Sequence, residues 1–148
     1  MLSSQNALRS DRISVRRRCW LALVGILLLT PLVIAVRLQP SPLGMGTHQQ
    51  LGLPPCTFVT LFGIRCPSCG MTTSWSHFVR GEWLQSLQAN VGGFLLAMVV
   101  AVSAAWMLLS AVTGRRLARV PSEGILAASA VILVLITMAD WVVRLTFR

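Results

Sequence analysis

The chain has 148 residues, of which 55% are hydrophobic and 11% are charged. Soluble domains carry roughly 25% charged residues, so this composition argues against an ordinary soluble domain and indicates a membrane protein of single-domain length. The formal net charge is +9, and all 13 basic residues are arginines. These arginines flank apolar segments and form no groove-sized patch, which argues against nucleic-acid binding.

Three apolar segments are long enough to cross a bilayer. Residues 19–36 contain no charge, and 18 residues of helix extend about 27 Å at 1.5 Å per residue. Residues 91–112 are also uncharged, and residues 125–143 are apolar except for Asp140. The sequence therefore predicts an all-α integral membrane protein whose three spans belong to one membrane domain, residues 19–148.

The segment before the first span is polar and rich in arginine. Residues 1–18 are therefore expected to form a disordered cytoplasmic tail. Three arginines in front of an apolar segment also resemble a secretory signal peptide. The segment is long, however, and no small-x-small cleavage site follows it, so we interpret it as an uncleaved anchor.

The distribution of arginines predicts the orientation of the chain. The N-terminal tail and the loop after the second span hold eight arginines, while the loop of residues 37–90 and the C-terminal tail hold five at lower density. Positive charge favours the cytoplasmic side. The N-terminus is therefore expected inside a bacterial inner membrane, and the loop of residues 37–90 is expected to be exported.

This loop contains an irregular stretch followed by two short amphipathic segments. Residues 37–55 are rich in proline and glycine and predict irregular structure. The two segments that follow have apolar side chains at helical spacing, at Trp75, Phe78 and Val79 and then at Trp83, Leu84 and Leu87. Both contain tryptophan, which favours the membrane interface. We predict two short interfacial helices here.

The second span carries small side chains at every fourth position. Gly93, Ala97, Ala101 and Ala105 form this series. Small residues on one face let helices approach closely in a bilayer. The series predicts a helix-packing face.

Three cysteines in the loop have the spacing C-x9-C-x2-C, at Cys56, Cys66 and Cys69. With His77, they could supply the four ligands of a zinc site, although no second C-x2-C pair is present. Alternatively, Cys66 and Cys69 could form a redox pair, because Cys69 lies just before a predicted helix whose N-terminus would lower its pKa. A structural disulfide needs only two of the thiols, and an exported loop would allow it.

The motif also resembles a known family. The segment "LPPCTFVTLFGIRCPSCGMTTSWSHFVRGEWLQSLQANVGGF" is similar to domain of unknown function 2752, a family of small bacterial membrane proteins with a CPxCGxT motif. The resemblance covers about residues 52–112, and Thr73 stands where many members carry arginine. It implies a fold and a membrane location, with no activity. The matching positions are Cys56, Gly63, Cys66, Pro67, Cys69, Gly70, Thr72, Arg80, Gly81 and Asn90.

Asp140 and the histidines are the other candidate site residues. An acid within a span is a functional candidate, yet Arg144 lies four residues later and is expected to pair with it. His48 and His77 are the only histidines, and a histidine on the polar face of a short helix is usually solvated. The sequence shows no nucleophile–histidine–acid set and no glycine-rich phosphate loop.

These observations predict a small multi-pass membrane protein of unspecified role. We expect its exported cluster of Cys56, Cys66 and Cys69 to organise a cap for a partner membrane protein or a second copy of the chain. This interpretation leans away from an enzyme. The alternatives are a membrane thiol-disulfide oxidoreductase using Cys66 and Cys69, and metal binding, with zinc as the cofactor.

Overall fold

The computed structural model describes residues 12–116 and 121–147. Within these ranges all regular structure is helical, apart from one isolated bridge between two arginines. The chain divides into two compact units, which are described separately. Unit 1 comprises Met1–Pro31 and Val100–Pro121, and unit 2 comprises Leu32–Val99 and Ser122–Arg148.

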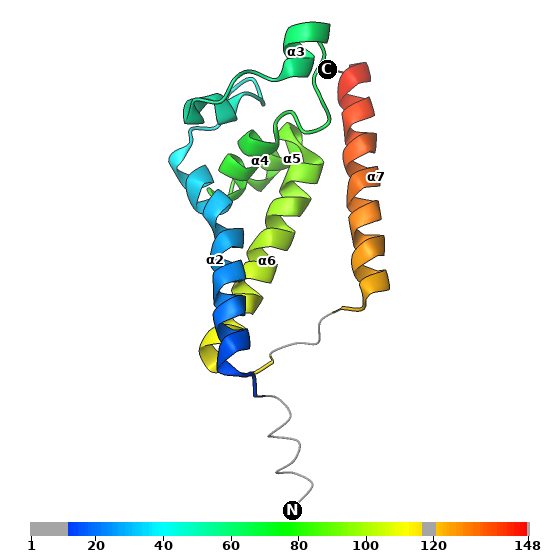
Figure 1. Ribbon diagram of the computed structural model, residues 1–148. Helices are drawn as coiled ribbons and strands as arrows, with labels where there is room; N and C mark the ends of the chain where they lie inside the picture. The colour runs from blue at the N-terminus through cyan, green and yellow to red at the C-terminus, as the bar shows by residue number, and fades with distance from the viewer. Residues whose placement is uncertain (1–11, 117–120, 148) are drawn as a thin grey trace, which may run out of the picture. The chain divides into compact units, whose positions relative to one another are not determined.

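Three long helices have the length and composition of membrane spans (Figure 1). They are α2 (Val15–Arg37), α6 (Val91–Thr113) and α7 (Glu123–Phe147). Most of their large apolar side chains lie on the protein surface, as side chains that face lipid must. The predicted all-α membrane fold is confirmed. Within the predicted tail of residues 1–18, residues 1–11 lie outside the described residues, and the prediction of disorder is wrong for residues 15–18, which form the first turn of α2.

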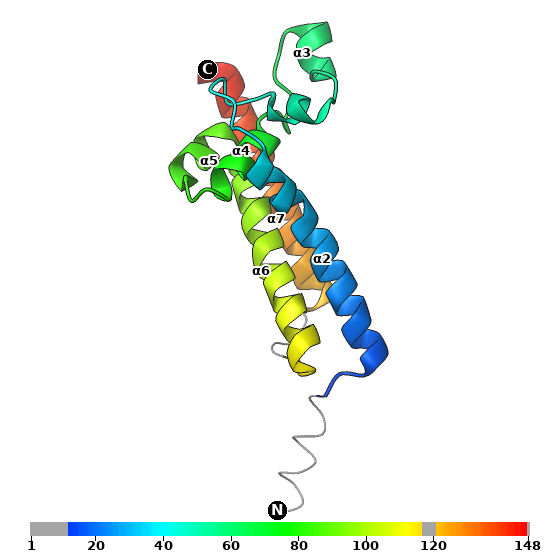
Figure 2. The same cartoon turned by 90° about the vertical axis from the view of Figure 1, so that its left-hand side faces the viewer.

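Four short elements lie between α2 and α6 (Figure 2). The two amphipathic segments form α4 (Met71–Phe78) and α5 (Trp83–Ala89), close to their predicted positions. The stretch that was expected to be irregular contains a 3-10 helix, η1 (Thr47–Leu51), and α3 (Thr57–Phe62) precedes the cysteine pair. Unit 2 therefore has one helical element, η1, that the proline- and glycine-rich sequence of residues 37–55 does not indicate.

The contact between α4 and α5 in unit 2 is built from hydroxyl groups. The side chains of Ser74 and Ser86 are fully buried, and their Oγ atoms lie 2.9 Å apart. Ser86 also donates to the Ser74 carbonyl at 2.7 Å, and Ser74 Oγ donates to the Asn90 carbonyl at 3.1 Å. Buried polar groups stabilise a fold only when they are paired, and here they are.

The C-terminal end of α2 is also held by Ser76 in α4 and by Arg80, which follows α4. The guanidinium of Arg80 donates to the Val36 carbonyl at 3.2 Å and to the Leu38 carbonyl at 2.6 Å. Ser76 Oγ donates to the carbonyls of Leu38, at 2.6 Å, and Ala35, at 3.1 Å. These are terminal carbonyls that lack a partner within the helix, and a cation is favoured at this end. The motif residue Arg80 therefore has a structural role.

Small side chains on α6 are buried at a spacing different from the predicted one. Gly93 and Ala97 are buried, but Ala101 is half-buried and Ala105 is exposed. Ala104 and Ala111 are buried instead. Residues four apart on an α-helix rotate about 40° per step, whereas residues seven apart return to within about 20°. A series of four-residue steps therefore leaves the buried face, and a seven-residue series stays on it.

Candidate metal centre

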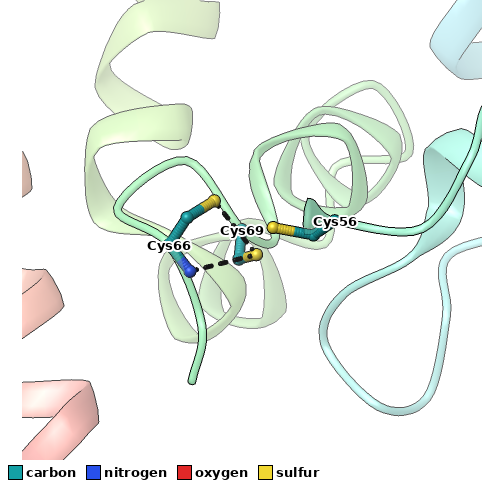
Figure 3. A group of neighbouring side chains, drawn as sticks. All are labelled: Cys56, Cys66 and Cys69. Carbon is teal, nitrogen blue, oxygen red and sulfur yellow. Dashed lines mark hydrogen bonds between the residues drawn. The ribbon is translucent and has the colours of Figure 1, made fainter. Parts of the chain in front are cut away.

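The three loop cysteines converge in space (Figure 3). The sulfur atoms of Cys56, Cys66 and Cys69 all lie within 4.8 Å of one another. The Sγ atoms of Cys66 and Cys69 are 3.1 Å apart, and the backbone N–H of Cys66 donates to the Cys69 sulfur at 3.3 Å. All three are thiols in this structure, so a disulfide among them stays a prediction.

Local backbone geometry explains how distant cysteines meet. Cys56 is the N-cap of α3, and Gly63 ends that helix with a φ of 68°, a left-handed conformation that favours glycine. Cys66 and Cys69 then lie in one turn, in which the Cys69 N–H donates to the Cys66 carbonyl at 3.0 Å. One short helix and one turn therefore bring the first cysteine back to the pair.

Gly70 is required by a close backbone crossing. Its φ is +89°, and a Cβ atom placed there would lie 2.6 Å from both the Ala89 carbonyl oxygen and the Gly44 carbonyl oxygen. No side chain fits between those two carbonyls, and the left-handed φ would strain any residue other than glycine. The motif glycine therefore fixes the exit of the cysteine turn into α4.

The three thiols differ in acidity. The backbone N–H of Val59, aided by the neighbouring Cys69 and Cys66 thiols, lowers the pKa of the Cys56 thiol to about 7 despite the opposing effect of burial. Burial, followed by the neighbouring thiols, raises the pKa of Cys69 to about 12. The helix α4 does begin beside Cys69, but the expectation that this would lower the pKa of Cys69 is wrong, because removal from water outweighs the helix N-terminus.

The carbonyl groups of the cysteine turn are held by two buried side chains. Arg144 donates to the Cys69 carbonyl at 2.8 Å and to the Pro67 carbonyl at 3.2 Å. The side-chain amide of Asn90 donates to the same two carbonyls, at 3.2 Å and 3.1 Å. Asn90 also accepts the Gly93 N–H at 2.7 Å, which ties the turn to the start of α6. Each carbonyl thus receives two hydrogen bonds.

Asp140 completes this arrangement. Its Oδ2 lies 2.9 Å from Nε of Arg144 and 3.4 Å from the backbone N of Val91, the first residue of α6. The contact with Arg144 is an ion pair without hydrogen-bond geometry, since Nε has no hydrogen-bond partner. The expected pair between Asp140 and Arg144 is therefore present, and the carboxylate also lies at a helix N-terminus, where negative charge is favoured.

A third contact joins α7 to the cysteine loop. The indole N–H of Trp141 donates to the Arg65 carbonyl at 2.6 Å. Together, Trp141 and Arg144 hold the segment of residues 65–69 from one end of α7, and Asp140 pairs with Arg144. Held at several points, the turn can present its sulfurs in a fixed geometry.

A cavity of about 500 Å³ opens beside the sulfurs. All three cysteines line it, and so does the motif residue Thr72. Further soft or nitrogen donors line the same cavity, at Met45, His48 and Met71. The metal-ligating group found among the described residues consists of the three cysteines, so His48 lies in the cavity wall without joining them.

The histidine named in the zinc alternative is placed elsewhere. His77 pairs through Nδ1 with the carboxylate of Glu82, and it lines a different cavity from the cysteines. The structure therefore does not bring His77 to Cys56, Cys66 and Cys69. The sequence suggests His77 because histidine is a common fourth ligand of zinc, but sequence spacing does not show which cavity its side chain lines.

Thr73, which follows the motif residue Thr72, is fully buried. Its Oγ1 lies 2.7 Å from Oγ1 of Thr47 in η1, and the backbone N–H of Ser41 donates to the Thr47 hydroxyl at 3.0 Å. In this chain the position joins α4 to the loop before it. The sequence did not indicate this pair, because Thr47 lies in a stretch that lacks helical periodicity.

The sequence also did not identify Arg144 and Trp141 as supports of the cysteine turn. Both act on backbone carbonyls more than seventy residues away in the chain. The acid and base spaced by four residues near the end of a span were the available signal. That spacing predicts an ion pair, and the structure adds the backbone carbonyls to which Arg144 donates.

Comparisons with known proteins agree with the motif. The family model "Protein of unknown function (DUF2752)" matches residues 56–104. No curated protein and no solved structure matches the chain. The match begins at Cys56 and includes both other loop cysteines, the motif glycine Gly70 and Asn90. Over these residues, the resemblance of this chain to DUF2752, a family of unknown function, is confirmed.

Proposed function

We propose that this membrane protein binds one thiophilic metal ion, zinc in the first instance, through Cys56, Cys66 and Cys69. The observation that carries the proposal is the convergence of three sulfurs to within 4.8 Å of one another. Thiolates are the ligands that zinc and Cu(I) prefer in proteins. Cys19, the remaining cysteine, is exposed and belongs to unit 1.

The sulfur spacing suits a metal after a small adjustment. Zn–S bonds of about 2.3 Å in tetrahedral geometry place sulfurs about 3.8 Å apart. Cys66 and Cys69, at 3.1 Å, would have to separate slightly, and all three sulfurs lie within the 4.8 Å range. The carbonyls clamped by Arg144 and Asn90 hold the turn, so only the thiol rotamers need to move.

Three protein ligands leave the fourth position of a tetrahedral zinc site open. Structural zinc sites usually have four protein ligands, whereas sites with three keep a position for water or a substrate. The cavity beside the sulfurs gives access to such a ligand, and His48 in its wall is the protein group that a local movement could supply. The site would therefore be an open one.

Thiol-disulfide exchange is the second candidate, favoured by the 3.1 Å separation of the Cys66 and Cys69 sulfurs. In this reaction a substrate disulfide is reduced to two thiols while Cys66 and Cys69 lose two protons and two electrons to form their own disulfide. Cys69 is buried, so the attack would start from Cys66 or Cys56.

The location of the site is part of the proposal. The arginine distribution favours a cytoplasmic N-terminus in a bacterial inner membrane, and it places the cysteines on the exported side. The exposed apolar residues of α3, Phe58, Leu61 and Phe62, support a role for this region as a cap against a partner protein or the membrane surface.

Metal content measured on the purified full-length chain tests the proposal. We expect zinc or copper at about one equivalent per chain by elemental analysis, and loss of the metal in Cys56→Ser and Cys69→Ser. Cys19→Ser is the matched control, because it removes one thiol outside the cluster, and it should keep the metal. Alkylation with and without reductant then counts the free thiols.

The outcomes separate the two candidates. Metal that remains bound in Cys69→Ser, or a preparation that takes up no zinc or Cu(I) when fully reduced, would overturn the metal proposal. A Cys66–Cys69 disulfide that forms and is reduced in intact membranes would favour thiol-disulfide exchange instead. A disulfide that forms and never cycles would overturn both.

A further inference from the structure

Unit 1 carries a cluster of arginines where α2 begins and α6 ends. The start of α2 and the end of α6 lie side by side in both views (Figures 1 and 2). The exposed arginines here are Arg12, Arg16, Arg17, Arg115 and Arg116. Because α2 and α6 both have the length and composition of membrane spans, the residues beyond their ends are expected at the depth of the lipid headgroups.

Two of these arginines are held directly opposite each other. Arg12 and Arg115 form an isolated antiparallel bridge, and the neighbouring Ile13 N–H donates to the Gly114 carbonyl at 2.9 Å. The hydrogen bond joins the flanking residues, so Arg12 and Arg115 are a non-hydrogen-bonded pair. In such pairs the Cα atoms are about 4.5 Å apart and the side chains are at their closest.

This pair lacks an anionic partner in the described part of unit 1. Like charges directly opposite each other on neighbouring strands are destabilising. The described residues of unit 1 include no aspartate or glutamate. The nearby Arg18 is different, because its guanidinium donates to two carbonyls near the end of α6, that of Ala111 at 2.7 Å and that of Val112 at 3.0 Å.

We infer that Arg12 and Arg115 together bind the phosphate group of an anionic membrane lipid. Guanidinium groups recognise phosphate through paired hydrogen bonds, and two of them facing each other can hold one phosphate from both sides. A bound phosphate would remove the repulsion between the two arginines. Lipid is the source that fits the position, because the pair lies just beyond two spans, where anionic headgroups are concentrated.

The test compares two double variants of the full-length chain in lipid nanodiscs. Arg12→Gln/Arg115→Gln removes the facing pair, and Arg16→Gln/Arg17→Gln removes the same charge from the same end. Retention of phosphatidylglycerol is measured by native mass spectrometry at about 0.5 M salt, which screens general surface attraction. A hydrogen bond to a charged group contributes about a tenfold effect, so loss of the facing pair should weaken retention at least about tenfold. The control should weaken it less than about fivefold.

Thermal unfolding provides a second readout. In phosphatidylcholine alone, Arg12→Gln/Arg115→Gln should unfold at the same temperature as the wild type or a higher one, because the repulsion is gone. Adding phosphatidylglycerol should raise the unfolding temperature of the wild type and leave that of the variant unchanged. A purely structural role for the two arginines predicts the opposite result in phosphatidylcholine.

Several outcomes would overturn the inference. Equal losses in the two double variants would show general attraction without a site, and no loss in either would show no lipid binding. Displacement of the lipid by millimolar inorganic phosphate would assign the site to free phosphate. Destabilisation by Asp11→Asn in phosphatidylcholine would show that the chain supplies its own anion.

Discussion

The arginines of the two units are used in different ways. In unit 2, Arg80 and Arg144 are directed at backbone carbonyls, and each holds a chain segment in place. In unit 1, Arg18 has the same use, but the arginines around it are exposed. The difference teaches that a count of arginines, which predicts topology, does not distinguish guanidinium groups that build the fold from those that face the surroundings.

The largest effect should come from Arg144, the arginine that holds the cysteine turn. Arg144→Met would leave Asp140 without its cation and two carbonyls with fewer donors, and loss of one partner of a buried ion pair lowers the free energy of unfolding by about 3–5 kcal/mol. Denaturant unfolding in detergent measures this change. An effect below about 1 kcal/mol would contradict the role of Arg144 in holding the cysteine turn.

A smaller loss is expected from closing the backbone crossing. Gly70→Ala adds a Cβ atom between two carbonyls and strains a left-handed φ, and we expect about 2–4 kcal/mol of destabilisation. Gly52→Ala is the matched control, because Gly52 has a φ of +77° but nothing within 4 Å. If the two variants lose equal stability in the same unfolding assay, the crossing contributes nothing beyond φ strain.

The cysteines of the metal-free protein should react at different rates. The pKa of Cys56 is about 7, so its alkylation should accelerate as the pH rises through 7 and level off above it. The pKa of Cys69 is raised to about 12, so this thiol stays protonated across the range and should react at least about tenfold more slowly at neutral pH. Mass spectrometry of peptides after timed alkylation measures both rates, and equal rates would contradict this order.

The smallest effect should come from an exposed arginine of unit 1. Arg16→Gln removes a charge that no described side chain pairs with, and exposed substitutions of this kind change stability by about 0.5 kcal/mol or less. The same unfolding assay compares it with Arg144→Met. A loss as large as that of Arg144→Met would show that the comparison between the units is wrong.

The spans and the short helices could be predicted because their signals are local. Long uncharged segments require helices in a bilayer, and side chains three and four residues apart define the faces of α4 and α5. The supports of the cysteine turn could not be predicted in this way. Contacts of Arg144 and Trp141 with backbone carbonyls leave no pattern near residues 65–69.

The details of packing were also beyond local reasoning. The sequence predicts that the small residues at every fourth position of α6 share one face. Each four-residue step rotates about 40° around the helix, however, and Ala105 lies on the exposed side. The sequence also does not show that His77 pairs with Glu82, a contact that holds this histidine away from the cysteines. The three cysteines can meet only if the chain between Cys56 and Cys66 reverses direction. Gly63, in the left-handed conformation at the end of α3, makes that reversal possible.

The contact of Arg144 in α7 with the cysteine turn has a consequence for folding during synthesis, because Arg144 is made long after the cysteines. Cys69 and Arg144 are 75 residues apart, and ribosomes add about 5–20 residues per second, so the turn waits about 4–15 seconds for its last support. During that interval the nascent thiols have no α7 to hold them in register. A cell that exports this loop into an oxidising compartment would therefore depend on rapid completion of the chain, or on a metal ion supplied early, to keep the three sulfurs from pairing wrongly.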